Sequence, residues 1–418
     1  MMQKSKEARS PVSKERAMEH ALLTIRRAWA GEVRGFEGWG GFQLDPEPIV
    51  LYDLNGQILF YEFGVMDGKE LVGSVKASAS KIIGSAVPTV EFGPRGWDPD
   101  DALKKANDEI KTRFPKANII EKELVCYSYP KIGVRIDIEE PEIGSQSLVL
   151  DVADLSLVER FGADELEGFT AYSFYQEIAE PNAFEREQRW ELADRELEAA
   201  RSATPRVFEP AFTAREMLDI RRTLVPQPVY PIPFYSSRTL QYSPRCPDRS
   251  HECFVLYGQE TDYYCACATG QMILDFYRYY YTQDQIAEAM GTYEPDELYP
   301  GHPGGTYNSG QVNGYESLSN NCLNATYDTT ANWSEAKAEI NANRPLKSGI
   351  FGHARACAGW KRQNIFIIGQ KPKRWLYIYD PWPWNANSCQ GGKILWEDWD
   401  AITHYNFIYV RHRVTPCT

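Results

Sequence analysis

The chain has 418 residues, which is long enough to form more than one hydrophobic core. Hydrophobic residues make up 43% of it, as in globular proteins, and the formal net charge is -13 at pH 7. This acidic balance argues against a general nucleic-acid or anionic-membrane binder, because either role requires a basic surface. No apolar run reaches the roughly 20 residues that cross a bilayer, so no membrane span is expected.

The N-terminal residues and the distribution of cysteines both bear on the compartment in which the protein resides. Residues 1–16 are charged and polar and contain no hydrophobic signal core, which predicts a protein that is cytoplasmic or exported by a non-classical route. Eight of the nine cysteines follow residue 245, a density that is typical of disulfides in an oxidising compartment. The two observations point in opposite directions, so the sequence leaves the redox state open.

Residues 1–165 have the pattern of a small α+β domain. Apolar residues at helical spacing predict a helix over 14–30, and Asn55-Gly56 predicts a hairpin between two strands. Asp98-Pro99 with following acids predicts the start of a second helix, which ends near Phe114. The predicted strands are 49–52, 58–63, 71–77, 125–138 and 147–152.

Residues 166–240 are predicted to connect two domains. The stretch 175–201 is rich in Glu, Arg and Ala and predicts a solvated helix. Four prolines then fall between Pro226 and Pro233, which predicts an extended, semi-rigid strap because proline excludes helix.

Residues 241–418 have helices first and strands afterwards, which predicts an α+β domain with an antiparallel sheet. Helices are predicted to start at Cys265, at the capping box Thr282–Gln285 and at Asn332. The predicted strands are 348–360, 365–369, 375–379 and 406–410.

The segment Gln259–Tyr277 carries the strongest chemical signal. Cys265 stands at the start of an apolar helix, where unsatisfied N–H groups and the helix dipole favour thiolate, the nucleophilic form. Gln259, six residues earlier, offers an amide N–H for an oxyanion that develops on a substrate carbonyl. The pair predicts an acyl-transferring cysteine enzyme.

A thiolate enzyme also needs a proton shuttle, and the chain has six histidines. His353 lies among small residues that allow close approach of a substrate, so it is the candidate base. His20 is expected on a surface and His302 in a surface turn; the others are His251, His404 and His412. Asp380 ends an apolar strand and can orient the imidazole, although a role as a turn cap is an alternative.

These residues resemble the active-site pattern of papain-like cysteine peptidases, in particular the bacterial C39-like branch. The similar features are Gln259, the aromatic pair before Cys265, Thr282–Ala287, Gly352-His353 and Asp380–Pro383, so the resemblance covers roughly residues 240–413. It implies a papain-like fold, thiol-dependent endopeptidase activity on protein or peptide substrates, and no cofactor or metal. Cys267 lies close to Cys265 and is a departure from the pattern.

The first 165 residues are similar, more loosely, to the prodomain of streptopain-type cysteine peptidases. The matching residues are Leu51–Gln57, Phe60-Tyr61, Gly73–Val75 and Tyr127–Lys131. This resemblance implies a zymogen whose own N-terminal domain inhibits it and is released by cleavage in the linker. A permanent substrate- or partner-binding domain is the alternative.

Other functions compete with peptide hydrolysis. The same site could transfer the acyl group to an amine, as a transamidase or peptide cyclase does. A structural zinc module is a different class, with Cys246, His251, Cys253, Cys265 and Cys267 as ligands. That spacing fits no standard CxxC pair and leaves His353 and Asp380 unexplained. A non-catalytic peptide-binding protein that keeps only the fold is the third alternative.

Overall fold

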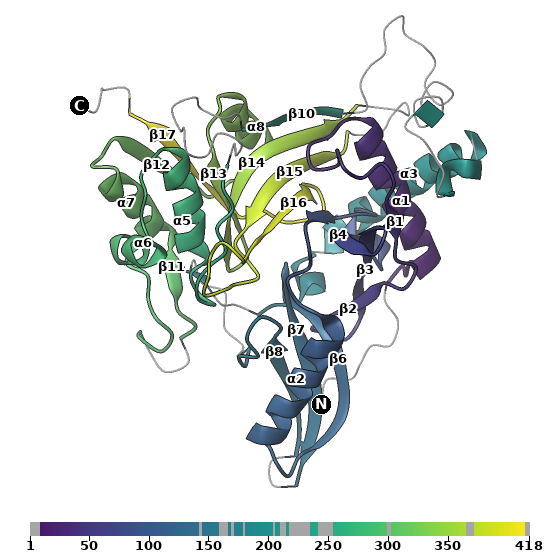
Figure 1. Cartoon of the computed structure of the whole chain (residues 1–418), viewed down its shortest axis with the longest axis horizontal. Helices are drawn as coiled ribbons and strands as arrows, with labels where there is room; N and C mark the ends of the chain where they lie inside the picture. Colours follow the sequence, from purple (N-terminus) through teal and green to yellow (C-terminus); the bar gives the residue numbers. More distant parts are fainter. Residues whose placement is uncertain are drawn as a thin grey trace, which may run out of the picture.

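The computed structural model describes residues 9–141, 144–158, 166–168, 171–178, 180–203, 205–209, 215–216, 235–240, 254–298, 302–364 and 372–413. Helices and a large, mainly antiparallel sheet make up this part of the chain, so the prediction of an α+β fold is confirmed (Figure 1). The prolines 226–233 and the strand predicted at 365–369 lie outside the described residues.

The first helix and hairpin form as their sequence signals predict. Helix α1 (Lys14–Ala30) begins after Ser13, whose hydroxyl accepts a hydrogen bond from the Arg16 N–H. Gly56 has φ +85° in the turn between β2 (Ile49–Asp53) and β3 (Ile58–Asp67), a conformation that glycine adopts easily. The neighbouring elements are β1 (Gln43–Leu44), β4 (Glu70–Ser78), η1 (Lys81–Ile83) and β5 (Thr89–Phe92).

The following segment forms a projecting hairpin sheet that is covered by α2 (Figure 1). Helix α2 (Pro99–Arg113) starts at Asp98, whose carboxylate caps the Asp101 N–H. The prediction of one strand over 125–138 is wrong: β6 (Asn118–Ser128) and β7 (Lys131–Glu140) are antiparallel and turn at Tyr129-Pro130. Proline cannot donate to the ladder, and here it marks a turn. Strand β8 (Gly144–Asp151) pairs with β7.

The connecting region contains a helix that is more than a solvated linker. Helix α3 (Glu180–Ala203) buries Trp190 and Leu197 in the same hydrophobic core as α1, although Phe184 is exposed as a linker residue would be. Its weak apolar periodicity concealed this packing. The short elements near it are β9 (Leu166–Gly168), η2 (Phe174–Glu177), η3 (Pro205–Phe208) and β10 (Tyr235–Thr239).

The C-terminal part places its helices beside one end of the sheet (Figure 1). Helix α5 (Cys265–Phe276) packs on β14, and α6 (Gln283–Met290) starts with the predicted Thr282 capping box. Helix α8 (Trp333–Asn341) starts after Asn332, as predicted, whereas α7 (Asn308–Leu318) was not predicted. Strands β11 (Gly305–Tyr307) and β12 (Leu323–Asp328) connect these helices.

The strands of this part differ from the prediction in two places. The predicted strand 348–360 is in fact β13 (Leu346–Ile350) and β14 (His353–Gln363), because Gly352 adopts φ +61° and turns the chain. Strand β16 (Lys393–Asp398) was not predicted, while β15 (Arg374–Asp380) and β17 (Asn406–His412) match their predicted positions.

One sheet runs through both the N-terminal and the C-terminal parts. Its order is β12-β17-β13-β14-β15-β16-β5-β4-β3-β2-β6-β7-β8, with β1 beside β3 and β10 beside β14. The antiparallel pairing of β16 with β5 joins the two parts (Figure 1). The strand ends that carry His353 and Asp380 lie next to each other because β14 and β15 are neighbours.

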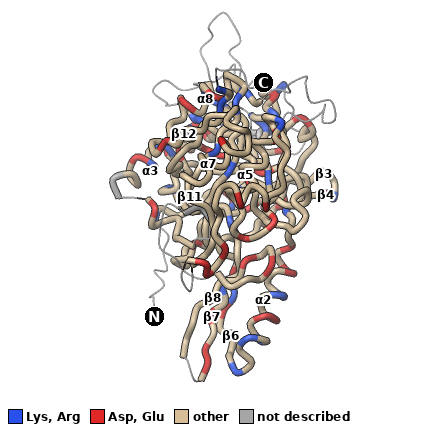
Figure 2. The backbone as a smooth tube through the Cα atoms, turned by 90° about the vertical axis from the view of Figure 1, so that its left-hand side faces the viewer, with Lys and Arg blue, Asp and Glu red and all other residues tan. Residues whose placement is uncertain are grey.

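Acidic and basic residues are interspersed over the described part of the chain (Figure 2). Among the described helices, none is both long and apolar enough to cross a membrane.

Candidate active site

The thiol of Cys265 lies at the first position of α5, as predicted. The preceding Tyr264 makes no side-chain cap, and the positive end of the α5 dipole favours negative charge on a thiol at this position. Cys265 is fully buried and forms a small apolar cluster with Ala266 and with Ala354 of β14. This contact brings the thiol next to the residue that follows His353.

His353 and Asp380 form a buried hydrogen-bonded pair. His353 opens β14 and Asp380 closes β15, and the His353 Nε2 lies 2.8 Å from the Asp380 Oδ1. The Trp382 N–H donates to the same carboxylate oxygen at 2.9 Å, so the carboxylate is held in place. Both side chains have no exposed surface.

The second ring nitrogen of His353 is available for chemistry. Within the described part of the chain, His353 Nδ1 has no hydrogen-bond partner, although the atom is buried. Burial lowers the pKa of His353, and the charge of Asp380 opposes this effect. The carboxylate therefore stabilises the imidazolium while Nδ1 remains the nitrogen that can exchange a proton.

Gln259 lies beside this pair, and its backbone N–H donates to the Pro381 carbonyl at 3.0 Å. Its side-chain Nε2 donates to the carbonyls of Thr261 and Asp262, each at 2.8 Å. The amide donors thus point into their own loop, and an oxyanion role requires the side chain to turn.

Cys267, the second thiol of the motif, lies in a different environment. Its Sγ is 3.3 Å from Thr292 Oγ1, and the residue belongs to the large hydrophobic core. Burial raises the pKa of the Cys267 thiol to about 12, which disfavours the thiolate.

Lys131, from the N-terminal part, reaches the same centre, and sequence reasoning gave it no role. Its side chain is fully buried. Burial lowers its pKa, whereas negative charge on Cys265 and Asp151 acts in the opposite direction, as does that on Asp262 and Asp380. The only feature of the sequence that singled out Lys131 was its position in Tyr127–Lys131, one of the segments that are similar to the prodomain of streptopain-type peptidases.

The histidines expected on the surface are buried. His20 Nε2 lies 2.9 Å from Asp194 Oδ1, a partner on α3 that the local helical pattern could not reveal. His302 Nδ1 accepts the Gly304 N–H inside its own loop, which allows the ring to be buried. His404 stacks on Trp399.

The zinc alternative gains no support from the described residues, which contain no group of three or more His, Cys, Asp or Glu side chains placed to hold a metal. Cys246, His251 and Cys253 lie outside the described residues. Cys322 is disulfide-bonded, and Cys126, Cys265, Cys267, Cys357 and Cys389 are free thiols.

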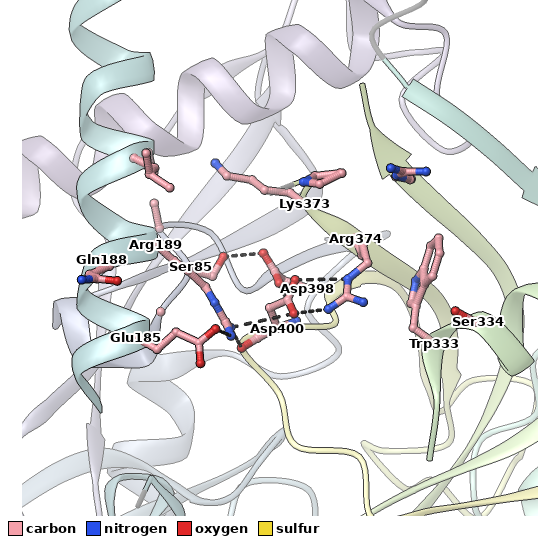
Figure 3. A pocket seen from close by; sticks show the side chains of 16 residues that line it. Ser85, Glu185, Gln188, Arg189, Trp333, Ser334, Lys373, Arg374, Asp398 and Asp400 are labelled. Atoms are coloured by element: carbon pink, nitrogen blue, oxygen red, sulfur yellow. Dashed lines mark hydrogen bonds and ion pairs between the residues drawn. The ribbon is translucent and has the colours of Figure 1, made fainter. Parts of the chain in front are cut away.

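A cavity of about 650 Å³ lies elsewhere, between α3 and the ends of β14, β15 and β16 (Figure 3). Polar contacts across it join residues distant in sequence: Ser85 donates to Asp398 at 2.7 Å, and Arg189 donates to the Asp400 carbonyl at 3.0 Å. None of the four predicted catalytic residues lines this cavity.

A thiol at a helix N-terminus, close to a buried His–Asp pair, is the arrangement of enzymes that transfer acyl groups through cysteine. Residues 252–405, which include Gln259, Cys265, His353 and Asp380, match the Peptidase_C39 like family. This match supports a C39-like cysteine peptidase. No curated protein and no solved structure gave a significant match.

Proposed function

We propose that the chain is a cysteine endopeptidase with a papain-like catalytic domain, in which Cys265 is the nucleophile, His353 the proton shuttle and Asp380 the orienting carboxylate. The observation that carries this proposal is the buried His353–Asp380 pair, 2.8 Å apart, beside a thiol at the start of α5. The family match to residues 252–405 supports it independently.

The reaction follows from the geometry. The Cys265 thiolate attacks the carbonyl carbon of the scissile amide and forms a C–S bond. His353 Nδ1–H donates its proton to the leaving nitrogen as the C–N bond breaks. Water, deprotonated by the same nitrogen, then attacks the thioester and releases the acid. The Cys265 backbone N–H and the Gln259 amide stabilise the oxyanion once Gln259 turns away from its own loop.

We assign the nucleophile to Cys265 rather than Cys267 on electrostatic grounds. Cys267 lies two residues further along α5, in the large hydrophobic core, and burial raises its pKa to about 12. Cys265 lies at the N-terminal end of α5, where the helix dipole favours the thiolate, and contacts the strand of His353.

The chain is further proposed to be made as a zymogen. Cys265, His353, Asp380 and Gln259 have no exposed surface, so a substrate cannot reach them in this conformation. Asp151 of the N-terminal part accepts a hydrogen bond from the Trp382 indole, and Trp382 donates its backbone N–H to Asp380, which supports inhibition by the chain's own N-terminal part.

The test compares Cys265→Ala with Cys267→Ala in the full chain, using hydrolysis of a peptide library with and without reductant. The proposal expects loss of hydrolysis only in Cys265→Ala. Full activity in Cys265→Ala would contradict it. Mass spectra of the products decide between hydrolysed peptides and ligated ones, and ligated products would instead identify a transamidase.

A further inference from the structure

The seam between the N-terminal and C-terminal parts is built like the interior of one domain. Strand β5 pairs with β16 over Thr89–Phe92 and Ile394–Glu397, so backbone hydrogen bonds cross it. On the same seam, the Trp396 indole N–H donates to the Arg34 carbonyl at 2.9 Å. A sheet edge and a buried indole would be left without partners if the two parts separated.

Helix α3 ties the two parts together a second time. Its Glu196 side chain is buried and pairs with Arg27 of α1 at 2.9 Å. The same carboxylate accepts a hydrogen bond from Gln363 of β14 at 2.7 Å. Separation of the two parts would take either Arg27 or Gln363 away from the Glu196 carboxylate, which is costly for a buried charge.

A different element of the N-terminal part covers the catalytic centre. Tyr129 of the turn between β6 and β7 and the nearby Ile132 belong to one hydrophobic cluster with Ile350 and Trp382, and Lys131, which lies between them in sequence, is fully buried. Asp151 of β8 accepts a hydrogen bond from the Trp382 indole at 3.4 Å. Trp382 also donates its backbone N–H to Asp380. Trp382 therefore links the Asp380 carboxylate to Asp151 of the cover.

The cover also reaches the turn that precedes His353. The rings of Tyr172 and Phe351 are 4.8 Å apart, and the Tyr172 N–H donates to the Tyr127 carbonyl at 2.8 Å. Strand β9 pairs with β11 and contacts both α5 and β14. Tyr172 thus contacts the turn before His353, and β9 contacts the helix that starts with Cys265.

We propose that the β6–β7 turn is the gate of the catalytic centre, with Lys131 as the side chain that fills it, and that the gate opens while the rest of the N-terminal part stays docked through β5 and α3. This inference rests on the proposed function and changes its activation step. Cleavage of the connecting segment does not release the N-terminal part. The enzyme remains one folded unit, and substrate enters when Lys131 and its turn withdraw from the thiol.

The gate is tested in the full chain with Lys131→Ala, and the matched control is Lys122→Ala on the same hairpin, where the side chain is exposed. The rate at which iodoacetamide alkylates Cys265 is followed by peptide mass mapping across a range of pH. The plateau at high pH reports access to the thiol, and the midpoint reports its pKa. We expect the plateau of Lys131→Ala to rise by about tenfold, because the truncated side chain no longer fills the gate and the open state becomes more populated.

Equal plateaus in wild type and Lys131→Ala, with a shifted midpoint, would overturn the gate because Lys131 would then act on charge alone. A faster plateau without any peptide hydrolysis would keep the gate and contradict the proposed peptidase. Hydrogen exchange on the wild-type chain gives a second measurement that needs no variant. The amides of β6 and β7 near the turn are expected to exchange faster than those of β5, and the reverse order would contradict the gate.

Docking is tested by placing a cleavage site for an external protease within residues 217–234 of the full chain. After complete cleavage, the two fragments are expected to co-elute in size-exclusion chromatography under native conditions. Separate elution of folded fragments would overturn the permanent attachment of the N-terminal part.

Discussion

Replacing Arg355 with methionine is expected to destabilise the protein strongly, because Arg355, two residues after His353, forms a fully buried ion pair. Its guanidinium donates to both carboxylate oxygens of Glu397, at 2.5 and 2.9 Å, and neither side chain has exposed surface. Burial opposes the charge of Arg355, but the Glu397 carboxylate outweighs it and raises the pKa of Arg355.

The magnitude follows from what the variant leaves behind. Removing one partner of a buried pair costs about 3–5 kcal/mol, since the remaining charge stays buried without compensation. This is a large share of the 5–15 kcal/mol that typically separates folded from unfolded domains. Replacing both residues, as Arg355→Met with Glu397→Gln, removes the stranded charge and is expected to recover most of the loss, to within about 1–2 kcal/mol of wild type.

Urea unfolding followed by tryptophan fluorescence measures these free energies for wild type, both single variants and the double variant. A cost below about 1 kcal/mol for Arg355→Met would refute the reasoning, because an exposed pair behaves in that way. A double variant that is less stable than Arg355→Met would refute it as well.

Three further outcomes are expected. Lys361 is buried among four aromatic rings, and burial lowers its pKa to about 7 from 10.5. Lys361→Met should therefore raise the unfolding free energy by about 3 kcal/mol at pH 6, because cation–π contacts with the rings offset only part of the cost of burying the charge. This gain should shrink as pH rises from 7 to 10.5, and a constant gain in urea titrations at several pH values would exclude the mechanism. Asp380→Ala should lower kcat/KM about 100-fold, whereas Asp380→Asn, which can still accept the imidazole N–H, should lose about tenfold; equal losses would contradict an orienting role. Burial lowers the pKa of His353 and of His404, so the unfolded chain binds more protons than the folded chain below pH 6.5. Melting temperatures should fall as pH drops below that value, and a flat profile down to pH 5 would contradict this assignment.

Local signals in the sequence predicted local structure well. Caps at Asp98 and Thr282 set the starts of two helices, and Asn55-Gly56 set the first hairpin. The thiol at the start of α5 and the place of Asp380 at the end of its strand were also predicted, because each depends on residues close in sequence. His353 was predicted inside the strand 348–360 and instead opens β14.

Contacts between residues far apart in the sequence could not be predicted from local patterns. The pairing of β5 with β16 joins strands about 300 residues apart, and no local pattern specifies such a partner. The burial of Lys131 conflicts with the usual exposure of lysine, so only the tertiary structure brings it to Cys265. Trp190 was overlooked because α3 has few apolar residues, yet that side chain is fully buried.

The most direct test of the central claim is to trap the acyl-enzyme. The full chain is mixed with a peptide substrate, quenched in acid during turnover and digested for mass mapping. A covalent acyl group is expected on the peptide that contains Cys265, at the Cys265 sulfur, and it should be absent from His353→Ala. Acylation at Cys267 alone, or steady hydrolysis with no acyl group on either thiol, would contradict the proposed role of Cys265.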